Sequence, residues 1–229
     1  MTRSEAPFDW HKTQDEEYLD LSLRRLTQPS LKWVNQVATL IEEYGRGVSP
    51  YVVSVNDIGC NVGHLPKGLS EAGLACDYLG LDVSETYLRH ARRTFPDYAF
   101  SLHDIAGAPP RDADLSVCSA VLEHILPWQD ALDNILESTR STVYARTFFG
   151  PQYERSEYVK GESIPYWIQQ FSIVEFGEFC SQKGFAMRIV RDSATDSMPQ
   201  YLGCGVTRTF FLAELTRMPQ AGAMPSARR

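Results

Sequence analysis

Glycines and aspartates with the spacing of a nucleotide-binding site stand out in the first half of the chain. Gly59 and Gly63 follow the apolar segment 51–58, and a glycine lets the backbone approach a ligand closely because no Cβ intervenes. Asp82 lies nineteen residues beyond Gly63, where a carboxylate can accept two hydrogen bonds from a ribose diol. Asp57 precedes the first glycine. Together these residues predict a cofactor with an adenosine half.

The glycine spacing also discriminates between cofactors. The dinucleotide fingerprint GxGxxG requires glycines where this chain has Asn61 and His64, which disfavours NAD and FAD. An acidic residue followed by GxGxG is matched by Asp57, Gly59 and Gly63, with Asn61 in the central position. Asparagine tolerates a left-handed conformation better than most residues do, so the loop can still form.

Alternating strand and helix patterns would hold these residues at one edge of a sheet. Apolar, β-branched segments occupy 51–58, 76–82, 98–102, 114–119 and 142–148, with helical patterns between most of them. Such alternation favours parallel strands joined by right-handed crossovers, and it predicts an α/β, doubly wound fold. Ligands of these sheets bind beyond the carboxyl ends of the strands, where the aspartates lie.

The end of the chain follows a different pattern. Ser172 and Glu175 have capping-box spacing and predict a helix that runs to about Gly184. Strands at 185–190 and 206–215 then follow each other without a helix, so we expect them to pair antiparallel at one edge of the sheet. We expect one domain over 31–217, an N-terminal cap segment over 1–30 and a flexible tail over 218–229.

Three segments, NDIGCNVG, LGLDVS and SAVLEHI, resemble the class I S-adenosylmethionine-dependent methyltransferases in order and position. The resemblance spans roughly Val52 to Val190 and implies a Rossmann-like, mostly parallel, seven-stranded sheet with a terminal antiparallel hairpin. It implies S-adenosylmethionine as the cofactor, with Asp82 at the ribose, Asp104 at the adenine amino group and Ser119 at the methionyl end. The cofactor-binding residues that it implies are Asp57, Gly59, Cys60, Asn61, Gly63, Asp82, Val83, Asp104, Ile105 and Ser119.

Methyl transfer would need positioning and, for a hydroxyl acceptor, a base near the methyl group. His124 is the first candidate because its ordinary pKa near roughly 6.5 suits proton transfer around neutral pH. Glu123 is the second candidate, or a support for the loop.

The segment 150–170 is polar and aromatic, and we expect it to form a loop that covers the acceptor. Its aromatic residues are candidates for substrate binding: Tyr153, Tyr158, Tyr166 and Trp167. They favour a small polar organic acceptor methylated at oxygen, including a sugar or glycan precursor.

Composition narrows the remaining possibilities. The chain has 229 residues and a formal net charge of −7, which argues against a nucleic-acid partner. No apolar stretch reaches membrane-spanning length, so we expect a soluble, cytoplasmic protein. The five cysteines form no CxxC pair, and no metal site is predicted.

Two alternatives to an active methyltransferase remain open, and the oligomeric state is undetermined. A nicotinamide-dependent reductase would share Asp82, but no tyrosine here has a lysine four residues on, as the short-chain reductases require. A methyltransferase-like binding module without turnover is the other alternative, since Asn61 departs from the family pattern.

Overall fold

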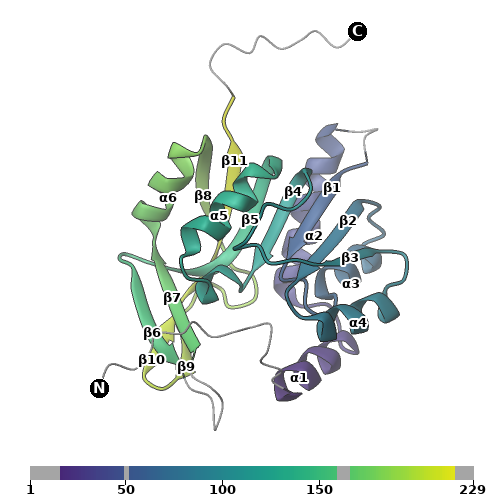
Figure 1. Ribbon diagram of the computed structural model, residues 1–229, viewed down its shortest axis with the longest axis horizontal. Helices are drawn as coiled ribbons and strands as arrows, with labels where there is room; N and C mark the ends of the chain where they lie inside the picture. Colours follow the sequence, from purple (N-terminus) through teal and green to yellow (C-terminus); the bar gives the residue numbers. More distant parts are fainter. Residues whose placement is uncertain (1–15, 49–51, 159–165, 220–229) are drawn as a thin grey trace.

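The computed structural model describes residues 16–48, 52–158 and 166–219. They form a mostly parallel sheet with helices packed against it (Figure 1). Its strands follow the order β3-β2-β1-β4-β5-β11-β8. They are β1 (Ser54–Ile58), β2 (Asp77–Asp82), β3 (Ala99–Leu102), β4 (Ala113–Ser119), β5 (Thr139–Gly150), β8 (Phe185–Arg191) and β11 (Phe210–Arg217). Because β1 pairs in parallel with β2 on one side and β4 on the other, the strand order reverses at β1, where such sheets bind ligands.

Helices cover both faces of this sheet, as the alternating pattern predicts. Helices α2 (Lys32–Val48) and α3 (His64–Glu71) bury their apolar stripes in one core cluster. Helices α5 (Trp128–Glu137) and α6 (Ile173–Gln182) pack in the other, where the Trp128 ring stacks on Phe176 at 5.3 Å between centroids. Helix α4 (Glu85–Thr94) packs on β2 and β3. The predicted doubly wound α/β architecture is confirmed.

The predicted antiparallel pair is confirmed, although its last strand is divided. β11 lies between β5 and β8 and is antiparallel to both. The predicted strand over 206–215 is split, because Val206–Arg208 forms β10, which leaves the main sheet to pair with β9 (Gln200–Gly203).

Most of the described part of the segment 150–170 forms strands, so the prediction of a loop there is wrong, and residues 159–165 lie outside the described chain. Glu154–Tyr158 and Tyr166–Ser172 form the antiparallel strands β6 and β7, and the end of β7 pairs with the end of β5. The polarity that suggested a loop is accommodated by buried hydrogen bonds. For example, the Gln169 amide donates to the Ile125 carbonyl at 2.7 Å.

Helix α1 (Glu16–Leu26) begins the described chain, in a segment where the sequence shows too little periodicity to predict an element. Its Tyr18 ring meets Tyr87 of α4 edge-on at 6.5 Å, which places α1 beside α4 (Figure 1). Most of the predicted tail lies outside the described residues.

Candidate active site

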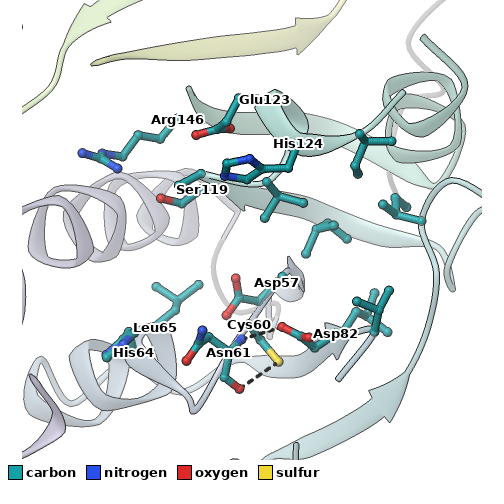
Figure 2. Close-up of a pocket in the computed structure, with 18 of the residues that line it drawn as sticks. Asp57, Cys60, Asn61, His64, Leu65, Asp82, Ser119, Glu123, His124 and Arg146 are labelled. Carbon is teal, nitrogen blue, oxygen red and sulfur yellow. Dashed lines mark hydrogen bonds between the residues drawn. The ribbon is translucent and has the colours of Figure 1, made fainter. Parts of the chain in front are cut away.

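A cavity of about 1200 Å³ opens at the carboxyl ends of β1, β2 and β4 (Figure 2). Nine of the ten residues implied as cofactor contacts line it: Asp57, Gly59, Cys60, Asn61, Asp82, Val83, Asp104, Ile105 and Ser119. The sheet therefore brings together, in one cavity, residues that are up to about sixty positions apart in the sequence.

The loop after β1 has the left-handed backbone that its glycines predict. The φ angles are 70° at Gly59, 53° at Asn61 and 98° at Gly63, so the conformation inferred for Asn61 is confirmed. A Cβ on Gly59 would lie 2.2 Å from a methyl carbon of Val121. Gly63 does not line the cavity, and a Cβ there would meet the Phe95 ring at 2.7 Å, so this glycine permits close packing against the end of α4.

Asp82 fastens this loop to the start of α4. Its carboxylate accepts the Asn61 backbone N–H on one oxygen and the Ser84 backbone N–H on the other, both at 2.9 Å. Ser84 is the N-cap of α4, since its hydroxyl accepts the Tyr87 N–H. The carboxylate oxygens of Asp82 keep lone pairs for further donors, because an ionised carboxylate offers about four acceptor positions.

Asp57 is buried beneath the loop and accepts a hydrogen bond from the Tyr78 hydroxyl at 2.7 Å. Burial raises the pKa of Asp57 to about 7, and the nearby charge of Asp82 adds to the rise against the lowering effect of the Tyr78 hydrogen bond. Nothing in the sequence pattern indicates Tyr78 as a partner, because the contact crosses from β2 to β1. Asp104 lies at the end of β3 and accepts the Ala106 N–H at 2.9 Å, in a turn that leads to buried Ile105.

The two candidate bases lie in a 3₁₀ turn (Leu122–His124) beyond β4, across the cavity from Asp57 and Asp82 (Figure 2). Glu123 is buried, and one of its oxygens accepts the Thr147 hydroxyl at 2.9 Å. Its other oxygen has no hydrogen-bond partner among the described residues. Burial raises the pKa of Glu123 to about 7.

Burial shifts the pKa of His124 in the opposite direction. Its Nδ1 atom lies 3.3 Å from the Trp167 carbonyl oxygen, and burial lowers the pKa of the imidazole to about 4. The side chain is therefore neutral at pH 7.

The family of this fold is identified by comparison with known proteins. Residues 56–142 match the family model described as a methyltransferase domain. The chain contains a methyltransferase domain. This confirms the family that the three sequence segments predict.

Individual relatives of the methyltransferase domain are distant. The Mycobacterium tuberculosis protein Rv1506c, whose name assigns it provisionally to the methyltransferases, is 38% identical over 68 residues. That match covers 30% of this chain and 41% of the relative, so it spans about two fifths of the relative's length.

Solved structures extend the likeness to nearly the whole chain. Magnesium protoporphyrin IX methyltransferase from Synechocystis PCC 6803, with bound S-adenosylhomocysteine, is 14% identical with a TM-score of 0.57, covering 90% of this chain and 89% of its own. The N-terminal domain of EvdMO1, crystallised in the presence of S-adenosylhomocysteine and D-fucose, is 12% identical with a TM-score of 0.60, covering 93% and 100%. At such identities the likeness shows the fold.

The far wall of the cavity comes from residues that the sequence did not single out and that lie outside the matched range 56–142. They are largely apolar and belong to α2, β5, β7, β9 and β11: Trp33, Phe148, Ile168, Leu202 and Phe210. Arg146 also lines this wall and forms an ion pair with Asp192 at 2.7 Å. Its guanidinium carbon lies 3.8 Å from the centre of the Phe210 ring. No local pattern marks these residues, since they meet only in the folded sheet.

Two of the four aromatic residues predicted to bind substrate, Tyr153 and Trp167, lie outside the cavity. The Tyr153 hydroxyl donates to Gln169 at 2.9 Å, and the Trp167 ring stacks with Arg155 at 4.3 Å, so neither side chain lines the cavity. The side chains of Tyr158 and Tyr166 lie outside the described part, although their backbones pair in the β6–β7 register.

Two further expectations concern metals and membranes. Within the described ranges, no group of histidine, cysteine and acidic side chains is arranged to hold a metal ion. None of the described helices is long and apolar enough to cross a membrane.

Proposed function

We propose that the protein is an S-adenosylmethionine-dependent methyltransferase that methylates a small polar organic molecule at oxygen. One observation carries the proposal. The left-handed loop Gly59–Gly63 is held by Asp82 at the edge of a cavity that continues to Glu123 and His124. The methyltransferase domain match and the fold of the solved structures support the same assignment.

The cofactor end of the cavity fits an adenosyl sulfonium. Asp82 would use its remaining lone pairs for the ribose hydroxyls, and Asp104 would accept from the adenine amino group. Asp57 would face the ammonium group, and the Ser119 backbone would face the methionyl end. When bound, the cofactor supplies an electrophilic methyl group, and the protein contributes orientation and the exclusion of water.

We assign the proton acceptor to Glu123 rather than to His124, which the sequence favours. A base works best when its pKa lies near the working pH, and about 7 for the carboxyl suits neutral pH better than about 4 for the imidazole. Glu123 also lines the cavity, and its buried second oxygen has no hydrogen-bond partner among the described residues. His124, held at the Trp167 carbonyl, would position the turn.

The acceptor's class follows from the far wall. The rings of Trp33, Phe148 and Phe210 contribute apolar surface to this wall, and Glu123 and the Arg146–Asp192 ion pair lie beside them. A hydroxylated ring fits such a wall, since its faces stack while its edges form hydrogen bonds. The presence of D-fucose with the EvdMO1 domain supports a sugar as one candidate.

Thermal unfolding with added ligands tests the cofactor. A ligand that binds only the folded state raises the melting temperature, so S-adenosylhomocysteine should raise it and NAD should not. Stabilisation by NAD alone would favour a reductase, and no stabilisation by either compound would reject the proposal. If S-adenosylhomocysteine stabilises the protein, S-adenosylmethionine consumption with a panel of hydroxylated rings separates an enzyme from a binding module without turnover.

A further inference from the structure

We propose that Arg25 of α1, together with His64, binds the carboxylate at the amino-acid end of the cofactor and thereby fixes α1 over the cavity. This inference rests on the proposed function, because it assigns one end of the same ligand. The family model does not include α1, since its match begins at residue 56.

One stripe of α1 faces the cavity. Tyr18, Ser22 and Arg25 recur at helical spacing; Ser22 is buried, and the other two side chains line the cavity. Arg24, the next residue on the same helix, is exposed and does not line the cavity. Of two adjacent arginines, one therefore lines the cavity and the other lies in solvent.

No carboxylate in the described part of the chain neutralises the charge of Arg25. Arg25 makes no ion pair with any carboxylate among the described residues. Two nearby cations are already engaged, since Arg146 pairs with Asp192 and Lys67 pairs with Glu71. Arg25 is thus available to an anionic group of a ligand.

His64 lines the cavity near Arg25 and shows at which end of the cavity the Arg25 charge lies. Burial, followed by the charges of Arg25 and Lys67, lowers the pKa of His64 to about 4, so the imidazole beside Arg25 is neutral at pH 7. A neutral imidazole can donate an N–H without repelling the guanidinium. His64 lies on the far side of Asn61 from Asp82 (Figure 2).

The arrangement of charges matches the cofactor's zwitterionic end. A ligand whose ribose binds at Asp82 directs its amino-acid group along the loop toward His64. There the carboxylate of Asp57 faces the ammonium group, and Arg25 meets the carboxylate. A guanidinium can bind a carboxylate through two parallel hydrogen bonds, which are stronger than bonds between neutral groups.

The test compares two adenosyl ligands by calorimetry. S-Adenosylhomocysteine has the amino-acid end, whereas 5′-methylthioadenosine keeps the adenosine and the thioether but lacks that end. Arg25→Ala should weaken binding of S-adenosylhomocysteine by about 10- to 100-fold and leave 5′-methylthioadenosine nearly unchanged. Arg24→Ala is the matched control and should alter neither affinity, and Arg25→Lys should recover part of the loss.

Hydrogen exchange provides a second readout of α1. Amides of residues 16–26 should be protected by S-adenosylhomocysteine and not by 5′-methylthioadenosine. Equal weakening of both ligands by Arg25→Ala, or no weakening of either, would overturn the role of Arg25 while leaving the proposed function intact. If the wild-type protein bound neither compound, the proposed function itself would fail.

Discussion

Replacing Glu123 with glutamine should make the protein's stability respond differently to pH. Burial raises the pKa of the folded carboxyl from its ordinary value of 4.5 to about 7. Between these values the folded state binds more protons than the unfolded state, so this group's contribution to the free energy of unfolding decreases as pH rises. At about 1.4 kcal/mol for each pH unit, the loss amounts to about 3 kcal/mol between pH 4.5 and pH 8.

Urea unfolding of both proteins at several pH values measures this effect. Glutamine keeps an oxygen that can accept the Thr147 hydroxyl, and it does not titrate. The stability of Glu123→Gln relative to wild type should therefore increase by about 3 kcal/mol from pH 4.5 to pH 8. The raised pKa of Asp57 acts in both proteins and cancels in the difference.

His124→Asn serves as a control with the opposite sign. The folded pKa of His124, about 4, lies below its ordinary value of 6.5, so its contribution is present above pH 6.5 and lost as pH falls toward 4. The stability of His124→Asn relative to wild type should thus decrease as pH rises over that range. A pH-independent difference for Glu123→Gln would refute the raised pKa and remove the main reason for preferring Glu123 as the base.

Three substitutions in the cofactor end should have graded effects on S-adenosylhomocysteine binding, measured by calorimetry. Asn61→Gly should preserve or tighten binding, because φ is 53° and the one bond that the Asn61 side chain makes to a described residue is local, from the Val62 N–H. A tenfold loss would contradict this. Gly59→Ala should weaken binding at least tenfold and destabilise the fold by about 1–3 kcal/mol, since its Cβ would lie 2.2 Å from Val121; wild-type melting and affinity would show that the loop adapts. Asp82→Ala should cost about 1.5–3 kcal/mol of binding for each ribose hydrogen bond lost, and an unchanged Kd would limit Asp82 to holding the loop.

The sequence predicts the cofactor half of the molecule well because the signals there are local. Ser172 caps helix α6 as predicted, since capping depends on residues three positions apart. The left-handed loop at Gly59 is likewise encoded by adjacent residues. Parallel pairing then brings the strand ends together without further information.

The far wall of the cavity, where we propose that the acceptor binds, could not be predicted in the same way. Gln169 reads as a loop residue by polarity, yet it is buried and bonded to the Ile125 carbonyl of another segment. Trp33, Phe148 and Phe210 are separated by more than a hundred residues at the extremes, and each resembles an ordinary core residue. Only tertiary packing shows that they share one wall. The sequence therefore led us to predict substrate binding by the aromatic residues of segment 150–170 instead.

The choice between Glu123 and His124 illustrates why a catalytic role cannot be assigned from residue type alone. In water the imidazole is the stronger base, because its pKa exceeds that of a carboxyl by about two. Burial disfavours the charged form of each group, which raises the carboxyl pKa and lowers the imidazole pKa. In this turn the two effects reverse the order, to about 7 for Glu123 and about 4 for His124. The acid limb of turnover should therefore have its midpoint near pH 7 if Glu123 is the base, whereas a midpoint near pH 4 would return that role to His124.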